Sequence, residues 1–198
     1  PGTVDNDATG SDYTIGFDTA VNTALDAIDR IRDTAESYER CFIVEVMGRG
    51  SGALAIAAAL AGGAEEVCVP ETPTDVSALA QRLLAGRAAG RLSSIIVTAE
   101  GDESGGAQAL ADKLSQTCGL QFRVCVLGHI QRGGSPTARD RILASRLGAF
   151  AVDLLARGEG HLVIGEVSGA LAVTPLQQVG EPRPAPAHDV ALISLLSR

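Results

Sequence analysis

Residues 1–7 read Pro-Gly-Thr-Val-Asp-Asn-Asp and place two carboxylates two positions apart, next to a hydroxyl, in a polar loop. One of these carboxylates can take a proton from a substrate hydroxyl, while the other faces a metal ion or orients the substrate. Asp and Asn also favour ordinary surface turns, because their side chains hydrogen-bond the local backbone. Taken alone, the loop fits a turn better than a catalytic site.

Three further segments carry residues suited to phosphate or sugar chemistry. MGRGSG (47–52) can place backbone N–H groups and Arg49 against a phosphate. GHIQRGGSP (128–136) sets His129 and Arg132 before a Gly-Gly turn, which suits a sugar phosphate, and Glu100 could accept hydrogen bonds from sugar hydroxyls. The simpler interpretations are a glycine-rich turn, a structural histidine and a solvated acid. Neither GxGxxG nor a P-loop motif is present.

The elements that must position these residues alternate along the chain. Apolar runs and helical periodicity predict four strands and four helices: strands 41–47, 66–71, 93–100 and 122–128, and helices 17–33, 51–62 (with Ser51 as a candidate cap), 76–90 and 106–118. Alternation of this kind predicts an α/β fold, a mostly parallel sheet with helices on both faces. Ligands bind at the carboxyl ends of such strands, where the glycine-rich and charged loops lie.

The remainder predicts a helix over 137–156, a strand near 161–167, a Pro-rich loop over 177–187 and a closing helix over 188–197. Arg40 and Arg123 each precede a strand, at the end opposite to the loops described above. A single subunit would struggle to bring them to the same ligand, whereas a neighbouring subunit could.

Composition narrows the function classes. A formal net charge of −8 argues against a general nucleic-acid binder. The four cysteines form no CxxC pair and predict buried, reduced thiols in a cytosolic protein. No apolar run approaches the ~18 residues of a transmembrane helix, so no membrane partner is expected.

Taken together, these segments resemble the bacterial, ATP-dependent 6-phosphofructokinase family. The similar stretches follow the family order across residues 1–150 and more loosely to the end: PGTVDND, GSDYTIGFDTA, AIDRIRDT, VEVMGRGSG, AALAGGAEEV and VLGHIQRGGSPTARDRILASRLGA. The resemblance implies a phosphofructokinase-like, three-layer αβα fold and transfer of a phosphoryl group from ATP to the 1-hydroxyl of fructose 6-phosphate. Magnesium, ATP and ADP are the implied ligands, and a cytoplasmic homotetramer is the implied assembly.

The resemblance also implies roles for single residues. Asp5 would be the base for the 1-hydroxyl, Thr3 and Asp7 would help to place substrate and magnesium, with Asp7 as the metal ligand, and Arg49 would stabilise charge on the transferring group. The implied fructose 6-phosphate contacts are Thr3, Asp5, Met47, Gly48, Arg49, Glu100, His129 and Arg132, with Arg40 and Arg123 holding the 6-phosphate in a neighbouring subunit's site.

The resemblance also bears on regulation and on the choice of phosphoryl donor. The implied nucleotide effector site comprises Arg32, Gly63, Glu65 and Arg91. Ala89 stands where the family commonly has a basic residue, which bears on effector affinity. Diphosphate-dependent relatives usually carry Lys at the position of Gly2, and Gly leaves room for ATP.

The family's ATP-binding loops precede the opening motif and are not present here. The sequence therefore predicts a fragment with an incomplete second domain: 1–16 and 131–180 from a nucleotide domain, 17–130 and 181–198 from a fructose 6-phosphate domain. We expect the fragment alone to lack kinase activity and to expose an apolar patch. Two alternatives stay open, a non-catalytic sugar-phosphate or effector-binding module and a diphosphate-dependent phosphotransferase.

Overall fold

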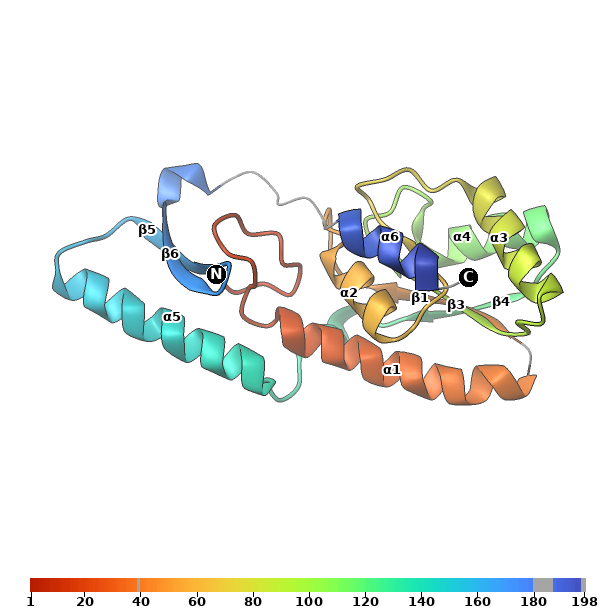
Figure 1. Cartoon of the computed structure of the whole chain (residues 1–198), viewed down its shortest axis with the longest axis horizontal. Helices are drawn as coiled ribbons and strands as arrows, with labels where there is room; N and C mark the ends of the chain where they lie inside the picture. The colour runs from red at the N-terminus through yellow and green to blue at the C-terminus, as the bar shows by residue number, and fades with distance from the viewer. Residues whose placement is uncertain (39, 180–186, 197–198) are drawn as a thin grey trace.

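A four-stranded parallel sheet forms the centre of the larger of two lobes (Figure 1). The computed structural model describes residues 1–38, 40–179 and 187–196. The strand order is β2-β3-β1-β4, with bounds β1 Cys41–Val46, β2 Glu66–Cys68, β3 Ser94–Ala99 and β4 Phe122–Val126. Strands buried on both faces require continuous apolar runs, and all six residues of β3 are buried.

Helices cover both faces of this sheet. One face packs against α1 (Phe17–Tyr38), α2 (Ala53–Ala61) and α6 (Ala187–Leu196), and the other against α3 (Val76–Ala88) and α4 (Gly106–Cys118). Successive β1 residues point to opposite layers: Ile43 belongs to the α3–α4 cluster, and Val44 belongs to the α1–α2 cluster. This arrangement confirms the three-layer αβα prediction.

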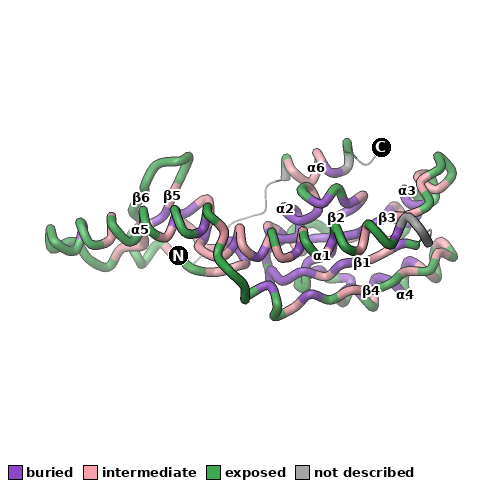
Figure 2. Tube along the Cα trace, turned by 90° about the horizontal axis from the view of Figure 1, so that it is seen from below, coloured by how far each residue is buried: buried purple, intermediate pink, exposed green. Residues whose placement is uncertain are grey.

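The smaller lobe consists of α5 (Ala138–Ala156) and an antiparallel hairpin of β5 (Leu162–Val167) and β6 (Ala170–Pro175). Two short 3-10 helices flank it, η1 (Gly128–Arg132) and η2 (Leu176–Gln178). The opening segment, residues 1–16, runs between the two lobes (Figure 1). Purple, buried backbone concentrates in the larger lobe, and α5 is mostly green or pink (Figure 2).

Several predicted boundaries need correction. The strand expected over 66–71 ends at Cys68, because Pro70 has no backbone N–H to continue a ladder. The strand expected over 122–128 ends at Val126, where the chain turns into η1. The helix expected over 17–33 continues to Tyr38.

Two local features were also predicted differently. The N-cap of α2 is Gly52 rather than Ser51, although the Ser51 hydroxyl still accepts the Ala53 N–H at 3.3 Å. Strand β6 was not predicted. The signal for it is the Ser168-Gly169 pair, whose φ angles of 52° and 79° are those of a type I′ hairpin turn.

Most of the Pro-rich loop expected over 177–187 lies outside the described residues. All four cysteines, which lie within the described ranges, are free; Cys41 and Cys68 are buried, and Cys118 and Cys125 are partly buried. Within those same ranges, no helix is long and apolar enough to cross a membrane.

Candidate functional site

The opening segment and the carboxyl-end loops of the sheet line one pocket of about 520 Å³. The lining residues come from three parts of the chain: Gly2, Thr3, Val4, Asp5, Asp7, Ile15 and Gly16 from the opening segment, Arg49 from the loop after β1, and Arg132 from the end of η1. The first and last of these are 130 positions apart in sequence, and the fold brings them to one cavity.

Hydrogen bonds within the opening segment fix its shape. Asn6 has a positive φ of 51°, which Asn tolerates better than most residues. Its Oδ1 accepts the Thr14 N–H at 2.9 Å, and its Nδ2 donates to the Asp12 carbonyl at 3.1 Å. The Thr14 hydroxyl donates to the Thr3 carbonyl at 2.6 Å, and the Thr3 hydroxyl accepts the Asp5 N–H at 3.1 Å. The backbone on both sides of Asp5 is therefore held in place.

Asp5 lies at the buried side of the pocket, and its side chain is only 7% exposed. Its Oδ1 is buried and has no hydrogen-bond partner, while its Oδ2 lies 3.9 Å from Nε of Arg49. Burial raises the pKa of the Asp5 carboxyl, the charge of Asp7 raises it further, and Arg49 opposes the shift. The charge of Glu100 also raises this pKa, and Arg132 lowers it. A carboxylate in this position is a stronger base than an exposed one.

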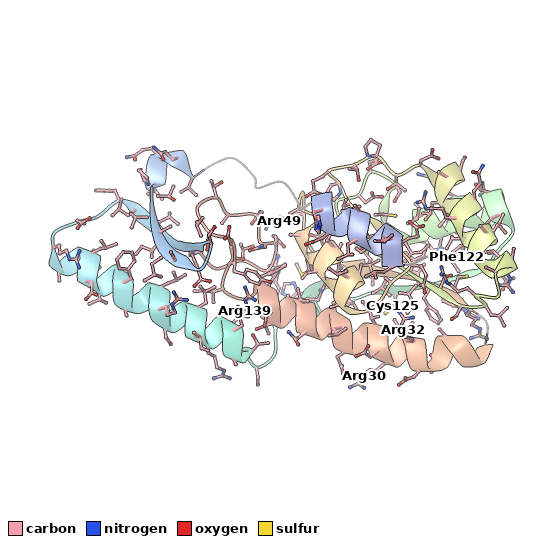
Figure 3. The ribbon with its side chains drawn as sticks, in the orientation of Figure 1. Arg30, Arg32, Arg49, Phe122, Cys125 and Arg139 are labelled. Atoms are coloured by element: carbon pink, nitrogen blue, oxygen red, sulfur yellow. The ribbon has the colours of Figure 1, made fainter. Side chains whose placement is uncertain are left out.

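The loop that carries Arg49 is tightly constrained. Arg49 has a φ of 51°, and its N–H donates to Oε1 of Glu100 at 3.0 Å. Gly48 also has a positive φ of 154°, and a Cβ at Gly101 would overlap the carbonyl oxygen of Arg49. Figure 3 shows Arg49 between the opening segment and the larger lobe. Its side chain is 72% exposed, so its charge is available to a ligand in the pocket.

Five of the predicted site residues line this pocket: Thr3, Asp5, Asp7, Arg49 and Arg132. Glu100 reaches it through the Arg49 backbone, and Met47 and Gly48 form the first part of the Arg49 loop. His129 lies one η1 turn before Arg132, is exposed, and does not line the pocket.

The structure places Arg40 and Arg123 away from the pocket, at the amino ends of their strands. Arg40 directly precedes β1 as predicted, whereas Arg123 was expected before its strand and is instead the second residue of β4. Cys41 pairs with Phe122 and Phe42 pairs with Arg123, so both arginines lie at the same end of the sheet, where the strands begin. The six residues of β1 separate this end from the pocket by ~20 Å at about 3.3 Å per residue. Both side chains are exposed, and they do not contribute to this pocket.

The predicted effector residues also lie together. Gly63, Glu65 and Arg91 line a second pocket of about 100 Å³, which α6 borders with Ile193 and Leu196. Arg32 donates to the carbonyls of Gly62 and Gly63, each at 2.7 Å, and lies 4.0 Å from the Glu65 carboxylate.

Two buried polar residues that hydrogen-bond the backbone of the pocket segments were not predicted from the sequence. Gln131 is fully buried, and its Oε1 accepts the Met47 N–H at 2.8 Å. Asp140 is 2% exposed and accepts the N–H groups of Gly16 and Thr19, each at 2.9 Å. Both residues lie inside motifs that were recognised, but their partners are 84 to 124 positions away in sequence, so only the fold reveals them.

Metal binding can be judged from the carboxylates of the pocket. Across the described residues, no group of three or more His, Cys, Asp or Glu is placed to hold a metal ion. Asp5 and Asp7 provide two carboxylates beside the pocket, and one buried Asp5 oxygen lacks a partner. Magnesium is commonly held by one or two carboxylates together with substrate phosphates. The residues present fit such a shared site.

Comparisons with known proteins agree with this geometry. The family described as Phosphofructokinase matches residues 1–155. ATP-dependent 6-phosphofructokinase 1 of Thermus thermophilus is 58% identical over 183 residues, 92% of this chain and 57% of that protein. The ATP-dependent 6-phosphofructokinase of Bacillus subtilis is 54% identical over 83% of this chain and 51% of its own length. The chain thus spans little more than half the length of these relatives.

Solved structures show the same fold. The phosphofructokinase of Saccharomyces cerevisiae superposes with a TM-score of 0.81 at 33% identity, covering 89% of this chain and 25% of that chain. The pyrophosphate-dependent phosphofructokinase of Marinobacter aquaeolei superposes with a TM-score of 0.78 at 28% identity, covering 95% and 53%. Because the family match extends over most of the sequence and the sheet, helices and pocket loops agree with it, the chain belongs to the phosphofructokinase family.

Proposed function

We propose that the protein containing this chain is an ATP-dependent 6-phosphofructokinase of glycolysis, a transferase that converts fructose 6-phosphate to fructose 1,6-bisphosphate. One observation carries the proposal. A buried carboxylate with a raised pKa and an unpartnered oxygen, Asp5, lines a pocket together with two arginines, Arg49 and Arg132. Phosphoryl transfer to a hydroxyl needs a base at the hydroxyl and positive charge at the phosphoryl oxygens.

In this proposal Asp5 Oδ1 accepts the proton of the sugar 1-hydroxyl. That oxygen has no internal partner, whereas Oδ2 faces Arg49. Burial keeps the carboxyl poorly solvated, which raises its pKa and so its proton affinity. The buried base is therefore available for a hydroxyl that docks in the pocket.

Arg49 and Arg132 supply the positive charge of the site. Arg49 stabilises the negative charge that develops on the transferring group, because its exposed guanidinium is free to pair with phosphoryl oxygens in the pocket. Arg132 binds the sugar phosphate, with His129 near it on η1. Glu100 has one oxygen on the Arg49 N–H, so its other oxygen is the one that would meet a sugar hydroxyl.

Magnesium would be held at Asp7 and by phosphate oxygens, with Thr3 beside it on the pocket wall. When bound, it neutralises phosphate charge during transfer. Asp7 also raises the pKa of Asp5 in the absence of the ion, so a cation at Asp7 would make Asp5 a weaker base. The protein's own carboxylates thus link cation binding to the strength of the base.

ATP is favoured over diphosphate as the donor by the relatives and by Gly2. The curated relatives at 54–58% identity are named ATP-dependent, whereas the pyrophosphate-dependent structure is 28% identical. Gly2 lines the pocket, and a Cβ there would come only within 4.0 Å of the Ile15 carbonyl oxygen. The absence of a side chain keeps that wall of the pocket open.

A second copy of the chain would complete the sugar-phosphate site. Arg40 and Arg123 are both exposed at the end of the sheet where the strands begin, too far from the pocket of their own chain to reach it. We therefore propose self-association that places this end of the sheet beside a neighbour's pocket, within a cytoplasmic homotetramer. The pocket beside Arg32, Gly63, Glu65 and Arg91 is the proposed site for a nucleotide effector.

The test is phosphoryl transfer by the protein that contains this chain. We expect fructose 1,6-bisphosphate to form with ATP and not with diphosphate, and Asp5→Asn to lower kcat about 10² to 10⁴-fold. Asp153→Asn, an exposed substitution on α5, is the matched control. Binding of fructose 6-phosphate without turnover would favour the non-catalytic binding module. Turnover with diphosphate and not with ATP would favour the diphosphate-dependent phosphotransferase.

A further inference from the structure

Gln131 is the one polar residue among the twelve largest side chains that are fully buried in the described part of the chain. The other eleven are aliphatic. Burying a carboxamide is unfavourable unless it is hydrogen-bonded, so an apolar residue would be the simpler choice for this position. The contacts of Gln131 show what its amide group provides.

In the first contact, the Gln131 side chain takes the place of a backbone acceptor in the parallel sheet. β1 and β4 pair up to Glu45 and Val126, and the Leu127 N–H donates to the Glu45 carbonyl. In a regular parallel ladder, the next bond would join the Met47 N–H to the Leu127 carbonyl. Instead the Met47 N–H donates to Oε1 of Gln131 at 2.8 Å. The side chain therefore replaces a strand carbonyl at the point where β4 leaves the sheet.

The second contact ties the same side chain to α1. Nε2 of Gln131 donates to the Ala20 carbonyl at 3.5 Å, a long bond. One buried side chain thus joins η1, the end of β1 and the first turns of α1. The next residue along η1 is Arg132, which lines the pocket, and Met47 begins the loop that carries Arg49.

We propose that Gln131 is a positioning residue, which fixes the Arg49 loop and Arg132 relative to Asp5 through its bond to the Met47 N–H. Gln131 does not line the pocket and would not contact a substrate. The loop after Met47 is stiff, because Glu100 accepts the Arg49 N–H and Gly101 lies against the Arg49 carbonyl oxygen. A displacement of Met47 would therefore be passed on to Arg49 and not absorbed within the loop. The proposed function gives this role its meaning, but the contacts can be tested without it.

The test follows the Arg49 amide by NMR of the 198-residue chain, because this N–H donates to Oε1 of Glu100 only while the loop after Met47 stays in place. Gln131→Met removes the acceptor for the Met47 N–H, so the amide signals of Met47 and Arg49 should both move from their positions in the parent chain. Gln131→Glu retains an acceptor oxygen and should move the Arg49 signal less.

Leu110→Ala is the matched control, because Leu110 is fully buried in the α3–α4 cluster, on the other face of the sheet from α1 and α2. It should lower Tm as Gln131→Met does, with the Arg49 amide signal unchanged. A Gln131→Met chain that loses Tm while its Arg49 amide signal stays at the parent position would overturn the proposal.

A second measurement on the parent chain needs no substitution and stays decisive if Gln131→Met does not fold. Amide hydrogen exchange at Met47 should be slowed at least 100-fold relative to an unprotected amide, since its acceptor is buried. Exchange at the unprotected rate would contradict the bond on which the proposal rests. Neither measurement requires fructose 6-phosphate, so failure of the proposed activity would leave both results interpretable.

Discussion

At the scale of single residues, Asp5 combines features that suit its proposed role as a base and that weaken the fold. Its carboxylate is buried, one of its oxygens has no partner, and its counter-charge Arg49 lies at 3.9 Å on an exposed side chain. An unpartnered buried polar atom costs about 1–3 kcal/mol of folding free energy. The opening segment tolerates this because Asn6 and Thr14 hold its backbone independently of Asp5.

We predict that Asp5→Asn stabilises the chain by about 1 kcal/mol at pH 7, measured by urea denaturation. The folded-state pKa of Asp5 lies above its ordinary value of 3.8, so the folded protein binds the proton more tightly than the unfolded chain does. Stability is then lost as the pH rises from 3.8 through the folded pKa, and replacing the charge should restore it. The gain should vanish below about pH 3.8; a loss of stability at neutral pH would contradict this account.

Residue types and spacing predicted the pocket members but not the residues that hold them. Asp5, Arg49 and Arg132 could be predicted because their three motifs together resemble those of one family, whereas the type and position of Asp5 alone favoured an ordinary turn. Gln131 and Asp140 could not, because their roles depend on which backbone groups lie beside them after packing, 84 and 121 or more positions away.

At the scale of elements, the start of α5 and the start of α1 cap each other. Asp140 of α5 accepts the N–H groups of Gly16 and Thr19 at α1, and also the Thr19 hydroxyl. Thr137, the N-cap of α5, donates its hydroxyl to Asp18 at 2.6 Å. A carboxylate at a helix N-terminus is favoured by the helix dipole. This reciprocal contact fixes Gly16, which lines the pocket.

We predict that Asp140→Asn lowers the free energy of unfolding by about 2–3 kcal/mol, because a buried charge that accepts several hydrogen bonds is replaced by an amide that must present N–H groups to other donors. Chemical denaturation provides the measurement. Asp153→Asn lies on the exposed part of the same helix and should change stability by less than about 0.5 kcal/mol. Equal effects of the two substitutions would refute the capping role.

A paired glycine experiment tests the Arg49 loop. Gly101→Ala would place a Cβ on the Arg49 carbonyl oxygen, so we expect it to displace the loop and destabilise the chain by about 2 kcal/mol or more. Gly148→Ala is on α5 with no atom within 4 Å of the new Cβ and should stabilise by about 0.5–1 kcal/mol. Thermal unfolding of both variants is sufficient; a neutral Gly101→Ala would show that the loop is not constrained there.

Element types could be predicted from sequence more reliably than their ends. The long apolar and periodic segments of the larger lobe gave the right order of strands and helices, since burial on both faces requires them. β2 was predicted too long, because its apolar run continues beyond the pairing that Pro70 permits. β6 is mostly exposed and lacks a strong pattern, so only its turn, Ser168-Gly169, signals it.

At the scale of the whole molecule, exposed apolar side chains gather on the smaller lobe. Six of the thirteen large apolar side chains exposed in the described ranges belong to it, and Leu176 of the flanking η2 is a seventh: Ile142, Val152, Leu155, Val167, Leu171, Val173 and Leu176. Figure 2 shows the corresponding exposed backbone of α5. We propose that 1–16 and 131–180, which include this lobe, belong to a nucleotide domain and that 17–130 with 181–198 form the fructose 6-phosphate domain.

We predict that the 198-residue chain associates at concentrations near 100 μM through this lobe, as observed by analytical ultracentrifugation, because large apolar patches favour contact with other molecules. Replacing Val152 and Leu155 with Glu should reduce the association. Leu92→Glu, at an exposed position of the larger lobe, should not. Association that is unchanged by the double substitution would show that another surface is responsible.

The central claim is that the pocket beside Asp5 binds fructose 6-phosphate, and calorimetric titration of the sugar phosphate into the 198-residue chain tests it most directly. We predict saturable binding that Arg132→Ala weakens at least 10-fold, the loss of one charge-assisted phosphate contact. Arg157→Ala, at the exposed end of α5, should leave the affinity unchanged. The account would be contradicted if no binding is seen up to about 10 mM fructose 6-phosphate, ten times the dissociation constant of a weak, millimolar ligand. Equal affinities for the two variants would contradict it as well.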